Sequence, residues 1–461
     1  MRNQKFRLAA RTLGAAALGF VLAGADSGAG GGASPAGEAQ QTPSVEARQT
    51  DDGALVCPGE TVRLPLNAKA SLDAYFQYEP FLYYELANPK LARVTSQGVV
   101  VPLAKGSTQV EVTASGPDRP AAVCSFRLQV VDPVKFKPAF APKTESRQTK
   151  VNGRQVYVNT IVLPKGMPAG LGLGKDALGS AEAMKAIVTR NQASYAINGT
   201  YFAAYNGEVP MPYGTLVKDG ELLFNTGSAG TMIAFSADGT ARLEEAAPSI
   251  DGGLDGLYDV ERRWKASYVN RRSGSGTTIY TPEYGTRIGT DKGVMIVVSA
   301  GKVAKVTKNE NVKIPRDGFV IVNQRESLSA LNNTFKIGRK AHYRVTYSNS
   351  EGRLSGWNDV VTAVHAWPKL IEGGKVVEKD GSDAKRAARS AIGLTKDGKV
   401  VMATTGSATH GEVAQLLRAK GAVEAMGLDG GASAGLYSQG VQLFTPGRSL
   451  SNVLLFGPNL R

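Results

Sequence analysis

The stretch THGEVAQLLRAKGAVEAMGLDGGASAGLYSQG, residues 409–440, decides the fold class of the C-terminal part of the chain. Its T-x-x-E capping box, Thr409 and Glu412, begins a helix, and Gly421 ends it. The apolar run AVEAMGL then predicts a buried strand that leads into the glycine loop DGGAS. An earlier segment, SAEAMKAIVTRNQ, predicts a helix capped by Ser180 and followed by the strand SYAIN. Helices between strands predict an α+β fold, a mixed β-sheet with packed helices.

The glycine loop also contains GASAG, which matches the G-x-S-x-G nucleophile elbow around Ser433. In α/β-hydrolases the acid and the histidine follow the serine, but all three histidines here precede it, at His342, His365 and His410. The segment after Ser433, AGLYSQGVQLFTP, alternates like a strand and does not resemble the start of a helix. A serine hydrolase therefore stays a minor alternative to chemistry at Asp429.

The N-terminus has the pattern of an exported protein. Basic residues precede the apolar run TLGAAALGFVLAGA, so residues 1–25 are predicted to be a cleaved signal peptide. Residues 26–53, rich in Gly, Ala, Ser and Pro, are predicted to be a flexible tether. We expect a secreted or periplasmic protein without a membrane span, because no second long apolar run follows.

The charge of the chain is basic. Removing four basic residues with the leader lowers the formal charge from +14 to +10. This charge fits a solvated surface or an attraction to anionic or phosphate-bearing glycans, including association with the cell envelope. Nucleic acid is not expected, because export and the lack of a concentrated Lys/Arg run argue against it.

Residues 54–132 alternate in short strands and predict a small β-sandwich. Its two cysteines, Cys57 and Cys124, predict one disulfide, because an even pair in an exported protein is typically oxidised. Around Arg93-Val94, Gly98-Val99-Val100 and Lys105-Gly106-Ser107-Thr108 the segment resembles bacterial immunoglobulin-like domains of type 2.

Residues 133–150 are a predicted linker with three prolines, and residues 151–461 form the main domain.

In the main domain, seven segments occur in the order found in the phosphodiester glycosidase family: YAINGTYF (195–202), PYGTLVKDGEL (212–222), IPRDGFVIV (314–322), AWPKLIEGGKVV (366–377), ARSAIGLTKDGKVVM (388–402), GEVAQLLRAKGAVEAMGLDGGAS (411–433) and RSLSNVLLFG (448–457). The chain resembles that family over residues 151–461. The family includes the enzyme that uncovers mannose 6-phosphate by removing N-acetylglucosamine from a phosphodiester. The resemblance implies a hydrolase of sugar-1-phosphodiesters in envelope or extracellular glycans.

The resemblance also implies the site residues. Catalysis is assigned to Asp429, Arg389 and Arg448, and substrate binding to Asn198, Gly199, Gly430, Gly431, Ser433 and Asn452. Tyr205, in the loop after the first motif, is a candidate for stacking on a sugar ring. The chain departs from the family pattern at Thr200-Tyr201, Ala388 and Ala432, and Thr405-Gly406-Ser407 replaces the usual DGR.

The assigned residues suit the chemistry. The phosphate of a sugar-1-phosphodiester is a stable leaving group, so one carboxylate can replace the usual pair of glycosidases. Asp429 would activate water or attack C1, while guanidinium groups bind the phosphate oxygens.

No zinc or EF-hand pattern is present, so neither a metal nor a cofactor is predicted. A non-catalytic glycan-binding protein on the same fold remains the alternative. The sequence leaves open the sugar, the aglycone and the stereochemical outcome.

Overall fold

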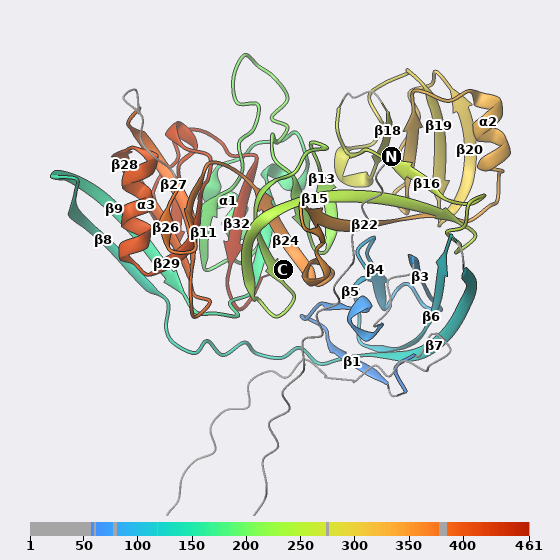
Figure 1. The fold of residues 1–461 in the computed structure, drawn as a ribbon, viewed down its shortest axis with the longest axis horizontal. Coiled ribbons are helices and arrows are strands. Elements are labelled where there is room, and N and C mark those ends of the chain that lie inside the picture. Colours follow the sequence, from blue (N-terminus) through green and yellow to red (C-terminus); the bar gives the residue numbers. More distant parts are fainter. Residues whose placement is uncertain are drawn as a thin grey trace, which may run out of the picture. The chain divides into compact units, whose positions relative to one another are not determined.

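The computed structural model describes residues 57–59, 61–76, 81–117, 119–272, 276–377 and 385–460 (Figure 1). All of them belong to one compact unit. The predicted signal peptide and tether lie outside the described residues. Within the described part of the chain, no helix is long and apolar enough to cross a membrane.

Residues 62–131 form two small sheets around a shared apolar core. The first contains β1 (Val62–Pro65), β7 (Arg119–Val131), β6 (Gly106–Gly116) and β3 (Phe81–Leu86), and the second β2 (Ala70–Ser71), β5 (Val99–Pro102) and β4 (Ala92–Val94). The predicted disulfide is confirmed, with Cys57 bonded to Cys124. Cys57 precedes β1, whereas Cys124 lies in β7. The immunoglobulin-like assignment stays a prediction.

A seven-stranded antiparallel sheet contains the strand that follows the helix with the capping box. Its order is β26 (Lys375–Val376), β25 (Lys369–Glu372), β29 (Ala422–Gly427), β27 (Ala387–Thr395), β28 (Val400–Ala408), β9 (Arg154–Leu163) and β8 (Lys143–Val151). Helix α3 (His410–Ala419) packs Val413 and Leu417 on one face of this sheet (Figure 1). The capping box of Thr409 and Glu412 is present as predicted.

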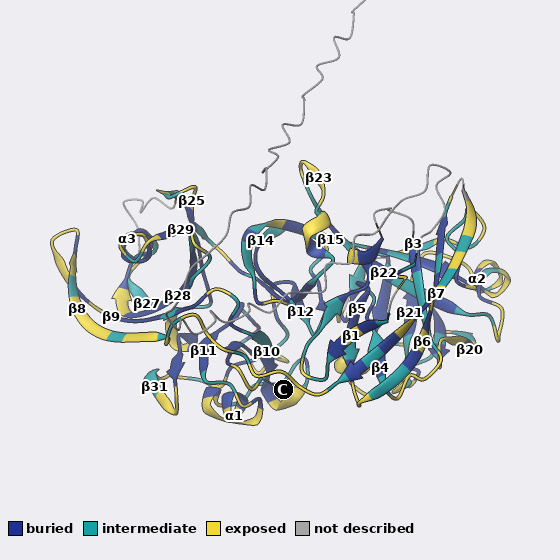
Figure 2. Cartoon of the chain, turned by 90° about the horizontal axis from the view of Figure 1, so that it is seen from below, coloured by how far each residue is buried: buried dark blue, intermediate teal, exposed yellow. Residues whose placement is uncertain are grey.

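The linker predicted for residues 133–150 is shorter in the structure. Residues 143–150 belong to β8, which pairs with β9 along its whole length and forms an edge of the sheet. Most positions in β8 are exposed (Figure 2), which explains why its sequence lacks the apolar alternation of a half-buried strand.

A second sheet packs on the other face. Its order is β10 (Ala169–Leu173), β32 (Asn452–Phe456), β11 (Tyr195–Asn198), β30 (Leu436–Ser438) and β31 (Val441–Phe444). Helix α1 (Met184–Arg190) begins after Ala183 without a side-chain cap, so the prediction of a Ser180 cap is wrong. The reason is that Glu182 forms a β-bridge with Leu450, which keeps the chain extended until Ala183.

Two further sheets complete the unit. An eight-stranded sheet contains β13 (Glu221–Phe224), β12 (Leu216–Lys218), β24 (Val360–His365), β14 (Gly230–Ser236), β15 (Ala241–Leu254), β22 (Ala341–Asn349), β23 (Gly352–Arg353) and β16 (Trp264–Ala266). The other contains β17 (Tyr268–Val269), β18 (Thr277–Tyr280), β21 (Gly318–Asn323), β19 (Val294–Ser299) and β20 (Lys302–Lys308), with α2 (Leu328–Thr334) beside β20.

The predicted α+β class with a mixed sheet is confirmed in part. The described chain is mostly β, with three short α-helices among the described residues. Strands pair in both directions, but among the described strands the parallel pairs are β1 with β7 and β17 with β18. Two-residue turns explain part of the strand content. Asp219 and Gly220 both have positive φ, as the turn between β12 and β13 requires, and so do Gln439 and Gly440 between β30 and β31.

Candidate active site

Asp429 lies in the loop that follows β29, where two sheets meet. Its backbone N–H donates to the carbonyl oxygen of Gly199 at 3.1 Å, just after β11. The preceding residue, Leu428, donates its N–H to the carbonyl oxygen of Ser390 in β27 at 2.8 Å. The loop is therefore held between the seven-stranded and the five-stranded sheet.

The Asn198 side chain is buried, with an exposed fraction of 1%, and forms hydrogen bonds to two residues of this loop. Its Nδ2 donates to the carbonyl oxygen of Asp429 at 2.6 Å, and its Oδ1 accepts from the N–H of Gly435 at 3.0 Å. Both ends of the amide bond to main chain, so the Asn198 side chain fixes the loop.

Asn452 and Gly199 form a second close contact, next to the loop. The Asn452 Oδ1 accepts from the N–H of Thr200 at 2.7 Å, and its Nδ2 donates to the carbonyl oxygen of Thr200 at 3.2 Å. A Cβ on Gly199 would lie 2.0 Å from Asn452 Oδ1. Glycine is therefore required at this position because the asparagine occupies the space of any side chain.

The Asp429 carboxyl is mostly enclosed by protein. Burial raises the pKa of Asp429 to about 6, whereas a hydrogen bond from the Ser433 hydroxyl, the charge of Arg448 and the N–H of Gly430 each favour the ionised form. A carboxyl with a pKa near 6 can exchange a proton close to neutral pH, as a general acid or base must.

Arg448 and Tyr205 lie on one side of this carboxyl. The Arg448 Nη2 donates to the Tyr205 hydroxyl oxygen at 3.0 Å, and its guanidinium carbon lies 4.5 Å from the centre of the Tyr205 ring. Tyr205 is 69% exposed, so the pair forms an open, cationic and aromatic rim. This placement brings together two residues predicted from distant motifs.

Arg389 lies in β27. Its Nε donates to the carbonyl oxygen of Ala408 at 3.3 Å, and its Nη2 donates to that of Lys385 at 2.7 Å. Its Nη1 lies 3.7 Å from the position that a Cβ on Gly430 would occupy, so the guanidinium lies beside the loop backbone. Gly431, with φ of 59°, turns the loop in the left-handed region.

Tyr201 forms an aromatic pair with Trp367, which is not among the predicted site residues. The Tyr201 ring stacks on Trp367 with ring centres 4.2 Å apart, and the Tyr201 hydroxyl donates to the carbonyl oxygen of Trp367 at 3.0 Å. Burial and the negative charge of Asp429 raise the pKa of Tyr201 to about 12, while Arg389 lowers it. Trp367 is 42% exposed. Its place in AWPKLIEGGKVV, one of the motifs of the family resemblance, is the sequence signal that could have identified it.

Four buried polar atoms without a hydrogen-bond partner belong to residues that neighbour the candidate site residues in sequence or in a strand pair. Among the described side chains they include Thr200 Oγ1, His365 Nδ1, Ser390 Oγ and Thr405 Oγ1. Thr200 follows Gly199, Ser390 follows Arg389, and Thr405 pairs with Arg389 in the sheet.

These residues can be compared with known proteins. Residues 292–457 match the model of the phosphodiester glycosidase family. The matched segment contains Arg389, Asp429, Arg448 and Asn452, whereas Asn198 and Tyr205 precede it. Among curated proteins, none matches the chain.

Two solved structures share the fold at low sequence identity, and a third is a weaker match. A hypothetical protein from Synechocystis is 20% identical with a TM-score of 0.57, covering 82% of this chain and 76% of its own. An exported-protein candidate from Burkholderia pseudomallei is 16% identical with a TM-score of 0.52, covering 81% and 96%. The zebrafish N-acetylglucosamine-1-phosphodiester alpha-N-acetylglucosaminidase catalytic domain, auto-inhibited by its pro-peptide, is 13% identical with a TM-score of 0.39, covering 77% and 89%.

Within the segment that matches the phosphodiester glycosidase family, Ser433 is not on a strand-to-helix elbow. It ends a single 3-10 turn, Gly431–Ser433, and the hairpin β30–β31 follows. Its hydroxyl donates to the Asp429 carboxylate. No group of three His, Cys, Asp or Glu suited to a metal ion was found among the described residues.

Proposed function

We propose that the chain is an exported hydrolase that cleaves the glycosidic bond of sugar-1-phosphodiesters in envelope or extracellular glycans. The observation that carries the proposal is Asp429. Its enclosed carboxyl, with a pKa of about 6, lies beside the Arg448 charge in the segment that matches the phosphodiester glycosidase family.

The reaction breaks the bond between C1 of the sugar and the phosphate oxygen. The phosphate monoester leaves with the bonding electron pair, and the oxygen of water forms the new bond to C1. Asp429 as a base takes the proton of that water; as a nucleophile it first bonds to C1 and is then released by water. Either role requires the ionised carboxylate.

The two arginines act on the leaving group in this proposal. Negative charge grows on the phosphate oxygens as the bond opens, and guanidinium groups bind such oxygens through two parallel hydrogen bonds. Arg448 already interacts with Asp429 and with Tyr205. Arg389 uses two nitrogens on main-chain carbonyl oxygens and has its Nη1 toward the loop.

In this proposal the sugar ring of the substrate stacks on the aromatic pair formed by Tyr201 and Trp367. The half-exposed Trp367 indole, stacked on Tyr201, offers a flat apolar surface, and Tyr201 lies near enough to Asp429 to feel its charge. Asn198, Gly199 and Asn452 act as positioning residues, because the two asparagine side chains bond to main-chain groups of the loop and of Thr200.

One assay tests the hydrolase and its alternatives. Purified wild type, Asp429→Asn and Ser433→Ala are incubated with a methyl phosphodiester of α-N-acetylglucosamine 1-phosphate, and free N-acetylglucosamine is measured. Release by wild type, lost in Asp429→Asn and retained in part in Ser433→Ala, supports the proposal. Loss in a folded Ser433→Ala variant with full activity in Asp429→Asn supports a serine hydrolase instead.

The second candidate is a glycan-binding protein without catalysis. Thr405-Gly406-Ser407 stands where the family resemblance expects DGR, which favours this candidate. Binding of an anionic wall polymer by the wild type, with no sugar released from the phosphodiester, would support it.

A further inference from the structure

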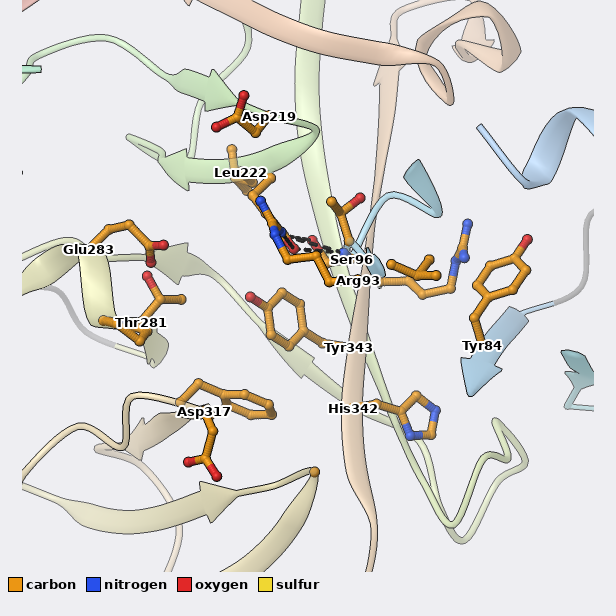
Figure 3. A pocket seen from close by; sticks show the side chains of 18 of the residues that line it. Tyr84, Arg93, Ser96, Asp219, Leu222, Thr281, Glu283, Asp317, His342 and Tyr343 are labelled. Carbon is orange, nitrogen blue, oxygen red and sulfur yellow. Dashed lines mark hydrogen bonds and ion pairs between the residues drawn. The ribbon is translucent and has the colours of Figure 1, made fainter. Parts of the chain in front are cut away.

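A cavity of 530 Å³, drawn in Figure 3, has a lining that does not include Asp429. Its walls come from residues 82–84 and 93–96 of the small sheets, the β12–β13 hairpin, residues 281–283 and the ends of β21 and β22. The hairpin turn binds the start of β24, where Gly220 N–H donates to Val361, whereas Trp367 follows the end of β24. The cavity and the Asp429 site are thus at opposite ends of this strand.

The cavity walls are fixed by hydrogen bonds. Glu221 accepts from the Ser96 hydroxyl at 2.6 Å and from the Ser96 N–H at 3.2 Å, and its carboxylate lies 3.4 Å from Arg93 Nη1. The Ser96 carbonyl oxygen in turn accepts from the Val345 N–H in β22 at 2.9 Å. A wall held in this way is formed before any ligand binds, which lowers the entropy cost of binding.

The charges that line the cavity balance. Four Arg or Lys and four Asp or Glu side chains line it. His342 is neutral, because burial first and then the Arg344 charge lower its pKa to about 3. A lining with no net charge favours neither a phosphate polymer nor a cation. The volume lies within the range of about 300–1,000 Å³ that small-molecule sites occupy.

The inner surface combines an aromatic face with polar groups. The Tyr343 ring packs edge-on against Phe319, with centres 5.1 Å apart. Figure 3 shows the Tyr343 hydroxyl on the side of its ring toward Thr281 and Glu283, and this hydroxyl also forms a side-chain hydrogen bond with Ser96. Within the described residues, no ion pair involves the Glu283 carboxylate, so it can accept hydrogen bonds from a ligand.

We propose that this cavity is a second binding site, which takes a short neutral oligosaccharide. The aromatic face contacts the C–H surface of a sugar ring, and Thr281, Glu283 and Tyr343 bond its hydroxyl groups. The site would hold a neutral stretch of glycan while the Asp429 site holds another part. Binding at the cavity does not require that Asp429 catalyses hydrolysis.

Isothermal titration of the full chain with chitotriose and with maltotriose tests the site. The variants are Glu283→Gln and Tyr343→Phe, with Glu351→Gln, an exposed acid on the β22–β23 turn, as the matched control. Trp367→Ala changes the Asp429 site and not the cavity, so it distinguishes binding in the cavity from binding at the Asp429 site. Thermal unfolding of each variant establishes that it is folded.

The proposal expects one of the trisaccharides to bind, and the Kd to rise at least fivefold in Glu283→Gln and in Tyr343→Phe. The Kd stays unchanged in Glu351→Gln, and this binding persists in Trp367→Ala. The proposal is overturned if neither trisaccharide binds at millimolar concentration, if both cavity variants bind like the wild type, or if Trp367→Ala abolishes all binding.

Discussion

The Asn198 side-chain amide donates to the main-chain carbonyl oxygen of Asp429 at 2.6 Å. The same amide accepts from the Gly435 N–H at 3.0 Å, so one buried side chain joins the start and the end of the loop that carries the candidate catalytic carboxyl. A carboxyl on a loop fixed at both ends keeps its position relative to C1 of a substrate, and small displacements of reacting groups cost large factors in rate.

Asn198→Ala removes both bonds and leaves two main-chain groups without partners. We expect kcat to fall at least tenfold with a smaller change in KM, and the free energy of unfolding to fall by about 1–3 kcal/mol. Asn198→Asp can still accept from Gly435 but cannot donate to Asp429. Kinetics on the sugar phosphodiester and urea unfolding measure both effects. Asn333→Ala, on the exposed side of α2, is the matched control. An unchanged kcat in an Asn198→Ala variant whose free energy of unfolding has fallen would contradict the positioning role.

The sequence predicts best where the signal is local. The Thr409–Glu412 box, the strand after it and the loop at Asp429 are as expected, because capping and strand burial depend on neighbouring residues. The role of Trp367 is not predictable in this way, since it arises only when the chain after β24 meets Tyr201 after β11. The contact between Gly199 and Asn452 likewise joins two strands that are distant in sequence. Ser180 fails as a cap because a tertiary β-bridge overrides the local preference.

The pH dependence follows from the Asp429 pKa of about 6. Because the ionised form is the reactive one, we expect kcat/KM to rise with pH to a plateau, with a midpoint near 6. Arg448→Gln removes a charge that lowers this pKa, so the midpoint of the remaining activity moves to higher pH. Initial rates between pH 4.5 and 8, a window chosen to bracket that pKa, measure both midpoints. A midpoint that does not move in Arg448→Gln would argue against this electrostatic contact.

The same pKa predicts the sign of a stability effect. The pKa of Asp429 is about 6 in the folded chain against 3.8 for an ordinary Asp, so the folded state holds this proton more tightly. Its contribution to stability is therefore present below pH 3.8 and is lost as pH rises through about 6. We expect Asp429→Asn to gain stability relative to the wild type as the pH is raised from 4 to 8, measured by urea unfolding at each pH. A difference independent of pH would contradict the raised pKa.

Gly199→Ala tests the steric requirement below the loop. The new Cβ would lie 2.0 Å from Asn452 Oδ1, so the asparagine must move and lose its bonds to Thr200. We expect a loss of about 2–4 kcal/mol in the free energy of unfolding, together with loss of activity. Gly116→Ala is the control, because a Cβ there meets nothing within 4 Å. Equal stability of the two variants would show that the loop tolerates displacement of Asn452.

Trp367 provides the test of the sugar-binding surface. Its indole is 42% exposed beside Tyr201, whereas Trp357 is 1% exposed. Trp367→Ala removes the stacked surface and is expected to raise KM about tenfold with a smaller change in kcat, and Trp367→Phe gives an intermediate value. Tyr157→Ala, which removes another half-exposed aromatic ring on β9, leaves KM unchanged. Fluorescence supplies a second readout, because the sequence has three tryptophans and Trp367 is the one that stacks on Tyr201. N-acetylglucosamine should change the emission of the wild type but not that of Trp367→Phe. A wild-type KM in Trp367→Ala would place the sugar on another surface.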